Sequence, residues 1–306
     1  MFGRTIWKGV AMKGLLERVQ AGEMLLCDGA MGTMLQARGL EPGTCPELWC
    51  LERPDDVMGI HQAYRDAGSD MVECNSFGGT RYKLSHYGLV DRCVAINAAA
   101  ARLGRSVAGA QQYVLGSMGP TGAMLEPYGD ETEEDVRAAF SEQVEGLQSG
   151  GADAVIIETM TALEEALVAL EAVRATAPDL VCIVSMTFDP VATGGYATMM
   201  GVRPEAFAEA CLRAGADVIA TNCGTGIDDM AKILRAMYGV TGDRVPLMAM
   251  PNAGMPVMEH GVTVFRETPD QMAGKVGCLV DAGARIIGGC CGTSPAHIAA
   301  LRAALR

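Results

Sequence analysis

Three cysteines in the second half of the chain have the residue type and spacing of a metal site. Cys223 lies in the phrase TNCGTG, and Cys290 and Cys291 are adjacent in the phrase GGCCG. Zinc takes tetrahedral sulfur ligands, and a catalytic zinc site offers three protein ligands with the fourth position open. The flanking glycines give the backbone freedom to turn both adjacent sulfurs toward one ion. The pattern favours zinc, and the alternatives are small buried apolar side chains or a redox pair at Cys290 and Cys291.

The elements that carry these cysteines repeat along the chain. A glycine, a small residue, a charged residue and an apolar run occur together four times, at Gly68, Gly151, Gly215 and Gly283. Each glycine follows an amphipathic stretch, which is typical of a helix end before a buried strand. With four similar apolar runs between them, eight strands are expected to start near Met24, Asp70, Tyr113, Ala154, Val181, Val218, Pro246 and Ala284. Eight βα units predict a single-domain (β/α)8 TIM barrel, with an open doubly wound sheet as the alternative.

In a barrel of this kind, the loops that follow the strands form the active site at one end. Residues at equal distances from the repeated glycine should therefore meet there. Seven and eight positions after each glycine come the pairs Asn75 and Ser76, Glu158 and Thr159, Asn222 and Cys223, and Cys290 and Cys291. Polar and thiol groups at matching strand ends are unusual for packing alone. We therefore expect these side chains to line one site.

Composition and charge disfavour several classes of protein, including nucleic-acid-binding and membrane proteins. The chain has 306 residues and a formal net charge of −13, which disfavours binding to nucleic acid or to an anionic membrane surface. No apolar run reaches the roughly 18 residues of a spanning helix, and the N-terminus does not read as a signal peptide, so we expect a cytoplasmic location. No linker composition divides the chain. We therefore expect one barrel domain over residues 1–306 with a short N-terminal lead, residues 1–14.

Most of the remaining cysteines and several methionines are expected to be structural, whereas Cys74 is ambiguous because it precedes Asn75 at a strand end and could lie near the site. Packing as small apolar side chains is predicted for Cys27, Cys93, Cys182, Cys211 and Cys278. A zinc ribbon at Cys45 and Cys50 is rejected because no second closely spaced pair follows. Near the presumed strand ends, Met118, Met186, Met199 and Met200 could line an apolar face for the methyl donor or fill gaps in the packing, and packing is favoured.

Seven phrases resemble the zinc-dependent homocysteine S-methyltransferase family, and most closely the homocysteine-binding domain of cobalamin-dependent methionine synthases. They are LCDGAMGTMLQ from Leu26, NSFGGTRYKL from Asn75, GSMGPTG from Gly116, ETMTALEEA from Glu158, TNCGTG from Thr221, PNAGMP from Pro251 and GGCCGTSPAHI from Gly288. Together they span nearly the whole chain and are specific, whereas any one alone is weak evidence.

The resemblance implies that Cys223, Cys290 and Cys291 bind zinc and that the sulfur of homocysteine fills the open position. Coordination to a metal deprotonates a thiol, which keeps a nucleophilic sulfur available near neutral pH without a general base. On this reading the zinc-bound thiolate takes a methyl group to form methionine, and the chain supplies no catalytic residue beyond the zinc-activated substrate.

The resemblance also suggests how the amino acid end of the substrate is bound. It implies that Glu158, with Asp28, meets the ammonium group. The backbone N–H groups of Gly29 and Ala30 could bind the carboxylate, because glycine at a strand-to-helix turn allows close approach. Asn75 and Asn222 are candidate polar supports. The alternatives are that Asp28 caps a turn and that the asparagines only satisfy loop backbone.

The methyl donor is less constrained than the acceptor. The phrases GPTG and PNAG are more like the corrinoid-linked branch, so we expect a methylated corrinoid, methylcobalamin, supplied by a separate partner protein. Alternative donors are S-methylmethionine, betaine and S-adenosylmethionine. Another small thiol is an alternative to homocysteine as the acceptor. Two non-enzymatic alternatives are a zinc-binding module and a vicinal dithiol redox module, and barrels also host other enzymes.

Overall fold

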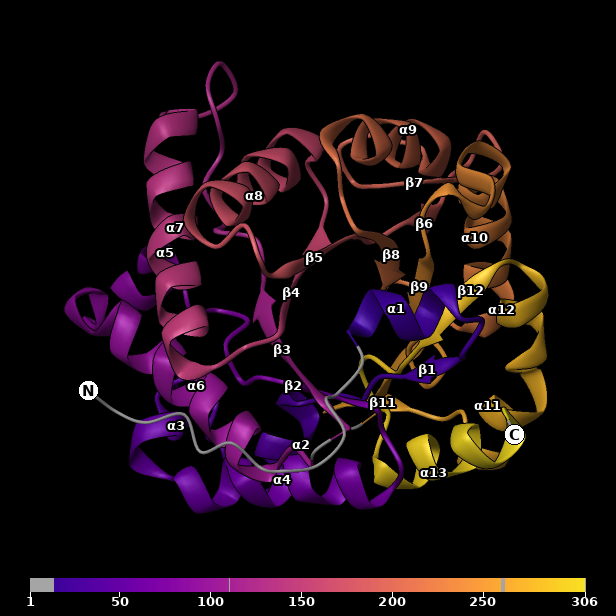
Figure 1. Cartoon of the computed structure of the whole chain (residues 1–306), viewed down its shortest axis with the longest axis horizontal. Coiled ribbons are helices and arrows are strands. Elements are labelled where there is room, and N and C mark those ends of the chain that lie inside the picture. Colours follow the sequence, from indigo (N-terminus) through magenta and orange to yellow (C-terminus); the bar gives the residue numbers. More distant parts are fainter. Residues whose placement is uncertain (1–13, 110, 260–261, 306) are drawn as a thin grey trace.

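The chain forms a barrel of eight parallel strands surrounded by helices (Figure 1). The computed structural model describes residues 14–109, 111–259 and 262–305. The barrel strands are β1 (Leu25–Leu26), β2 (Met71–Glu73), β3 (Tyr113–Met118), β4 (Ala154–Met160), β5 (Val181–Met186), β8 (Val218–Asn222), β9 (Leu247–Met250) and β12 (Ala284–Ile287). Each begins within one residue of its predicted start. The barrel confirms the predicted fold class over the open sheet.

The strands lie in the order β1, β12, β9, β8, β5, β4, β3, β2, and Asp70 joins the two ends of this order. Its backbone N–H donates to the carbonyl of Leu26 at 2.6 Å, and its carboxylate accepts from the N–H of Leu26 at 2.8 Å. Arg18 and Arg302 both form ion pairs with the same carboxylate. These contacts complete the barrel across its seam between β1 and β2.

The repeated glycine and the residue two positions later, which is an aspartate in three of the four repeats, have separate structural roles. All four repeat glycines have positive φ angles, from 78° at Gly215 to 102° at Gly283, which disfavour residues with a Cβ. Asp153 and Asp217 act like Asp70: each accepts from a backbone N–H of the neighbouring strand and forms an ion pair with Arg105 or Arg174, respectively. The repeat phrase therefore turns the chain out of a helix and then anchors the next strand.

Helices follow the strands in the expected alternation. The main outer helices are α4 (Pro54–Asp66), α6 (Cys93–Val107), α7 (Glu133–Gly150), α8 (Leu163–Thr176), α9 (Pro204–Ala214), α10 (Ile227–Thr241), α11 (Pro269–Lys275), α12 (Gly277–Asp281) and α13 (Pro295–Ala304). The hydroxyls of Thr132 and Thr268 cap α7 and α11 by accepting from the backbone N–H groups of Asp135 and Gln271, respectively. The shorter helices are α1 (Leu15–Gln20), α2 (Gly32–Ala37), α3 (Trp49–Glu52), α5 (Arg81–Ser85), η1 (Val90–Arg92) and η2 (Gly242–Arg244).

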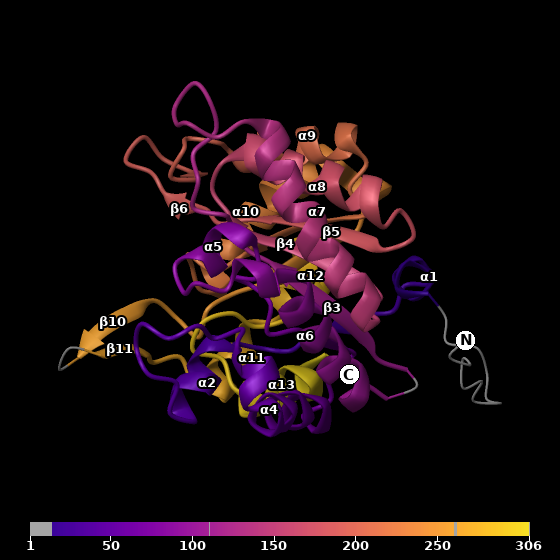
Figure 2. The ribbon, with the colours of Figure 1, turned by 90° about the vertical axis from the view of Figure 1, so that its left-hand side faces the viewer.

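The core has an inner layer inside the barrel and an outer layer between strands and helices. Along β4, Ala154 and Ile156 belong to the inner layer, whereas Val155 and Ile157 pack under the helices. This alternation explains why the strands are continuously apolar. Leu15 and Val19 of α1 also join the inner layer, and α1 covers the barrel end opposite the long hairpin β10 (Pro256–Glu259) and β11 (Val262–Phe265) (Figure 2).

The structure confirms some of the predicted burial of methionine and cysteine side chains and contradicts the rest. Met118 and Met186 are fully buried as predicted, but packing is wrong for Met199 and Met200, which are 84% and 50% exposed. Cys278 is also exposed, because it lies on the outward side of the short helix α12. The predicted lead falls on residues 1–13, which lie outside the described residues, and on Gly14, which caps α1. None of the helices in the described part of the chain could cross a membrane.

His61 of α4 is expected to make the protein less stable in acid. Its imidazole is fully buried, neither ring nitrogen has a hydrogen-bond partner among the described residues, and burial lowers its pKa from 6.5 to about 4. Between these pH values the unfolded chain binds a proton that the folded chain does not, so stability falls as pH falls. Relative to His61→Leu, the wild type should lose about 2 kcal/mol of unfolding free energy between pH 7 and pH 5.

Urea unfolding of both proteins at the two pH values measures this difference. The same substitution at the exposed His86 is the control and should give the same change with pH as the wild type. Equal pH dependence of His61→Leu and the wild type would show that the buried imidazole does not contribute.

Candidate metal and substrate site

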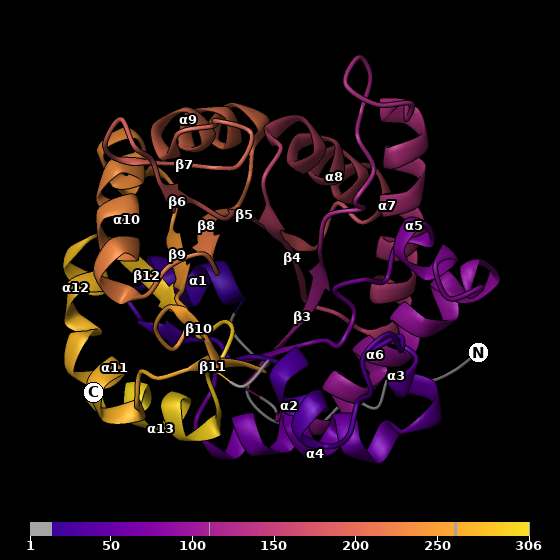
Figure 3. The same ribbon diagram turned by 180° about the vertical axis from the view of Figure 1, so that it is seen from behind.

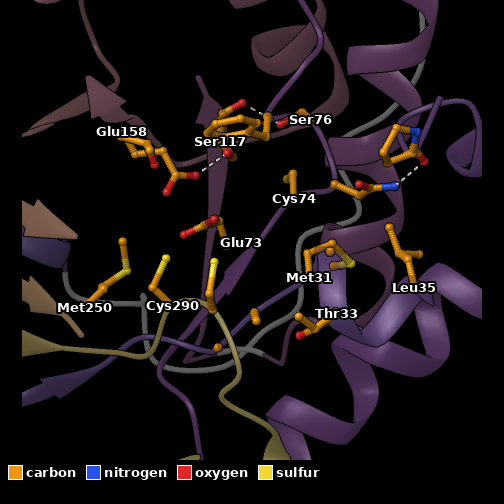
Figure 4. A pocket seen from close by; sticks show the side chains of 18 of the residues that line it. Met31, Thr33, Leu35, Glu73, Cys74, Ser76, Ser117, Glu158, Met250 and Cys290 are labelled. Atoms are coloured by element: carbon orange, nitrogen blue, oxygen red, sulfur yellow. Dashed lines mark hydrogen bonds between the residues drawn. The ribbon is translucent and has the colours of Figure 1, made fainter. Parts of the chain in front are cut away.

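A cavity of about 270 Å³ opens at the carboxyl ends of the barrel strands. Figure 3 shows this end of the barrel, and Figure 4 shows the side chains around the cavity. Its wall includes seven of the eight residues at matching repeat positions: Asn75, Ser76, Glu158, Thr159, Cys223, Cys290 and Cys291. Asn222 is fully buried behind the wall. The structure therefore brings seven of the eight repeat positions to one cavity and places Asn222 behind its wall.

The three predicted metal ligands meet at one side of this cavity. Their sulfur atoms all lie within 4.8 Å of one another, and the sulfurs of Cys223 and Cys291 are 3.9 Å apart. A tetrahedral site with zinc–sulfur bonds of about 2.3 Å needs sulfurs about 3.8 Å apart. Cys223 reaches this position through a left-handed backbone, with φ of 59°, which is rare for a residue other than glycine. The sulfur positions therefore fit a zinc ion.

The polar groups around the thiols also fit a cation. Hydrogen bonds from Cys290 and Cys291 lower the pKa of the Cys223 thiol, while hydrogen bonds with Cys223 and Cys291, together with burial, raise the pKa of Cys290. Asn252 hydrogen-bonds Cys223 through its side chain, yet its buried Oδ1 has no hydrogen-bond partner among the described residues. A buried unpartnered oxygen on a side chain beside the Cys223 thiol is unfavourable unless something binds there. The sequence analysis did not select Asn252, although it lies in the quoted phrase PNAGMP.

Glu158 is held at an irregular point of β4. The register between β4 and β5 shifts between Ile157 and Met160, and Thr159 within this bulge has φ of 59°. The Glu158 carboxylate accepts hydrogen bonds from the hydroxyl of Ser117 and from Nδ2 of Asn222, the latter at 3.1 Å. Burial raises the pKa of Glu158, and the Ser117 hydrogen bond opposes this shift. The carboxyl group thus stays fixed in the cavity wall.

The two predicted asparagines hold backbone in place. Asn222 accepts from the N–H of Thr159 at 2.9 Å and from the hydroxyl of Ser185 at 2.7 Å, so it stabilises the bulge that carries Glu158. Asn75 donates to the carbonyl of Pro46 at 2.8 Å, which fastens the loop before α3 to the cavity. Both side chains bond to backbone groups of neighbouring segments, which is one of the two roles considered for them.

The residues after β1 are placed at the cavity in different ways. Gly29 and Ala30 line it, but the N–H of Ala30 donates to the hydroxyl of Thr293 at 3.1 Å and is therefore already engaged. Asp28 is buried behind the wall, where its carboxylate accepts from the N–H of Glu73 at 2.9 Å. Burial raises the pKa of Asp28 to about 8.

Glu73 is a pocket residue that the sequence analysis missed. It lies five positions after Gly68, where the other repeats have Ile156, Ala220 and Gly288, so it was counted within an apolar run. Its alternation with the inward-facing Met71 could have indicated that its side chain points into the barrel. Figure 4 shows its carboxyl group in the cavity with Glu158.

Comparisons with known proteins agree with this geometry. The family model described as homocysteine S-methyltransferase matches residues 25–305. Methionine synthases of Mycobacterium tuberculosis and Mycobacterium leprae are each 34% identical, over 95% and 96% of this chain. The match covers 25% of each of these proteins, so the chain spans about a quarter of their length.

A solved structure with a similar fold is that of the homocysteine methyltransferase MmuM from Escherichia coli in its metallated form. It superposes with a TM-score of 0.77 and 26% identity, covering 94% of this chain and 99% of that one. The family match extends over nearly all the described residues, including the three cysteines and Glu158. By its sequence, its barrel and its cavity, the chain belongs to the homocysteine S-methyltransferase family.

Proposed function

We propose that this protein methylates the sulfur of homocysteine to give methionine. The observation that carries the proposal is that one cavity brings a three-thiol cluster together with a buried carboxylate, Glu158. A metal site that holds a thiol and an anion that meets an ammonium group are the two features that recognition of homocysteine requires. Family membership supports the same substrate.

We assign the metal ligands to Cys223, Cys290 and Cys291. The metallated state of the E. coli relative supports a metal in this family, and the sulfur spacing fits zinc. Zinc bound there would lower the pKa of the substrate thiol and keep its sulfur nucleophilic. With zinc bound there, the chain would need no general base beside the substrate thiol.

We assign the amino acid end of the substrate to the opposite part of the cavity wall. Glu158 receives the ammonium group, and Asp28 lies behind the wall as a second carboxyl group, where it accepts the N–H of Glu73. The backbone N–H groups of Gly29 and Ala30 receive the carboxylate, and Thr293 must release the Ala30 N–H for this to happen. Asn75 and Asn222 keep the loop before α3 and the β4 bulge in position.

A methylated corrinoid carried by a partner protein is the proposed methyl donor. The homology to methionine synthases supports this choice over smaller donors. The barrel also has exposed large apolar side chains on three loops around the cavity end, namely Met124, Tyr128, Met199, Met200, Met255, Val257 and Met258. An apolar rim of this kind suits contact with another macromolecule.

Zinc-edge X-ray absorption of the purified protein, with and without L-homocysteine, tests the proposal. We expect about one zinc per chain and a rise in sulfur coordination from three to four when homocysteine is added. Single-turnover transfer from added methylcobalamin then tests the donor. An absence of zinc, or zinc that does not respond to homocysteine, would contradict the assignment and favour a structural or redox role for the cysteines.

A further inference from the structure

The carboxyl groups of Glu73 and Glu158 lie together in the wall of the cavity, close enough to form a hydrogen bond when one of them carries a proton. Both side chains line the cavity wall, Glu73 from the end of β2 and Glu158 from the bulge of β4 (Figure 4). Two carboxylates that touch without a proton between them repel strongly, especially away from water. The pair therefore shares one proton.

The surrounding hydrogen bonds decide which residue holds that proton. Glu158 accepts from Ser117 and from Asn222, so donors are directed at both of its oxygens. Within the described part of the chain, no hydrogen-bond donor is directed at the Glu73 carboxyl, whose one hydrogen-bonding neighbour is Glu158. Donors stabilise a carboxylate and leave the neutral form to the group without them. Glu158 is therefore the charged acceptor and Glu73 the protonated donor.

The neighbours of Glu73 favour the same arrangement. The carboxylate of Asp28 accepts the backbone N–H of Glu73, and one oxygen each of Asp28 and Glu73 lies within 4.8 Å of the Cys27 sulfur. Burial and the charges of Glu158 and Asp28 together raise the pKa of Glu73 well above its ordinary value. No described basic side chain lines this cavity to balance a second negative charge.

We propose that Glu73 is a positioning residue whose protonated carboxyl donates to Glu158 and holds that carboxylate toward the substrate ammonium group. Glu73 thereby makes the site selective for thiols that carry an α-amino group, an inference that rests on the proposed function. With Ser117 and Asn222, it fixes the Glu158 carboxylate from three directions before substrate binds. Such preorganisation raises affinity because the group need not be ordered on binding.

Two substitutions at Glu73 test whether its side chain acts by donating a hydrogen bond or by its charge. Glu73→Gln keeps a neutral side chain that can donate to Glu158, whereas Glu73→Leu has a similar size and cannot donate. Calorimetric titration of the zinc-loaded proteins with L-homocysteine and with 4-mercaptobutanoate, which lacks only the amino group, measures selectivity directly. Zinc content and thermal unfolding of each variant show whether the metal site and fold are intact.

We expect wild-type protein to bind homocysteine about 100-fold more tightly than 4-mercaptobutanoate. Glu73→Gln should keep this ratio within about threefold. Glu73→Leu should lower the ratio to about 10 or less while its affinity for 4-mercaptobutanoate and its zinc content stay unchanged. This pattern would not arise from a purely structural defect, which would weaken binding of both thiols.

Two results would overturn the inference while leaving the proposed function intact. If both variants lose selectivity equally, the charge of Glu73 itself contacts the ammonium group. If neither variant loses it, Glu73 does not position Glu158. Wild-type protein that binds neither thiol would instead overturn the proposed function, and the inference with it.

Discussion

Replacing Cys223 by serine (C223S) is expected to remove both the metal and the activity. We expect less than about one tenth of the wild-type zinc content and a fall in kcat/KM for homocysteine methylation of more than about 10³-fold. The reason is that a serine hydroxyl is a poor zinc ligand, and changes to residues that only support ligands already cost about 10- to 100-fold in affinity or activity. Elemental analysis and a methyl transfer assay measure the two quantities.

The matched control is the same substitution at the exposed Cys278. C278S should keep its zinc and its activity, because that thiol lies on the outer surface of α12, away from the cavity. Full zinc content in C223S would show that Cys223 is not a ligand. Loss of zinc without loss of methyl transfer would separate the metal from the reaction and contradict the proposed role of the thiol cluster.

Glu158→Gln is expected to raise the KM for homocysteine by about 100-fold or more with zinc still bound. The amide keeps the shape of the carboxyl group and can still accept from Ser117, but it no longer presents a negative charge to the ammonium group. Hydrogen bonds between charged groups contribute about 1.5–3 kcal/mol, and removing one partner of a buried pair costs more because the other is left unpaired. Steady-state kinetics with homocysteine as the varied substrate measures the effect.

Glu164→Gln serves as its control, because Glu164 is exposed at the start of α8, six residues further along the chain. Its KM should match that of the wild type. An unchanged KM in Glu158→Gln would show that the ammonium group binds elsewhere. A fall in kcat alone, with zinc lost, would mean that Glu158 mainly supports the metal site through Asn222, which lies 3.9 Å from the Cys290 sulfur.

Periodicity made the fold accessible from the sequence. Repeated glycines mark the points where a helix must end in a left-handed turn, and buried parallel strands need apolar residues on both faces. These requirements are local, so the residues that satisfy them recur in each repeat. The same register placed Glu158, Cys223, Cys290 and Cys291 at strand ends, where the closed barrel brings them to one cavity.

Surface placement was harder to predict. Met199 and Met200 are apolar and were expected to pack, yet they lie exposed on the loop between β5 and α9. Cys278 was expected to be buried but lies on the outward face of a short helix. Hydrophobicity reports what a side chain would gain from burial, whereas its exposure depends on whether a neighbouring element covers it.

The sequence by itself thus determined the barrel, the thiol cluster and the position of Glu158, because each follows from residue type at a fixed spacing. Only the tertiary structure decided that Glu73 lies with Glu158 in one cavity wall, that the Ala30 N–H is engaged by Thr293, and that Asp70 joins β1 to β2. Each of these contacts joins segments at least 44 residues apart in the chain. Their energies depend on the distance between atoms of different strands, which no local pattern encodes.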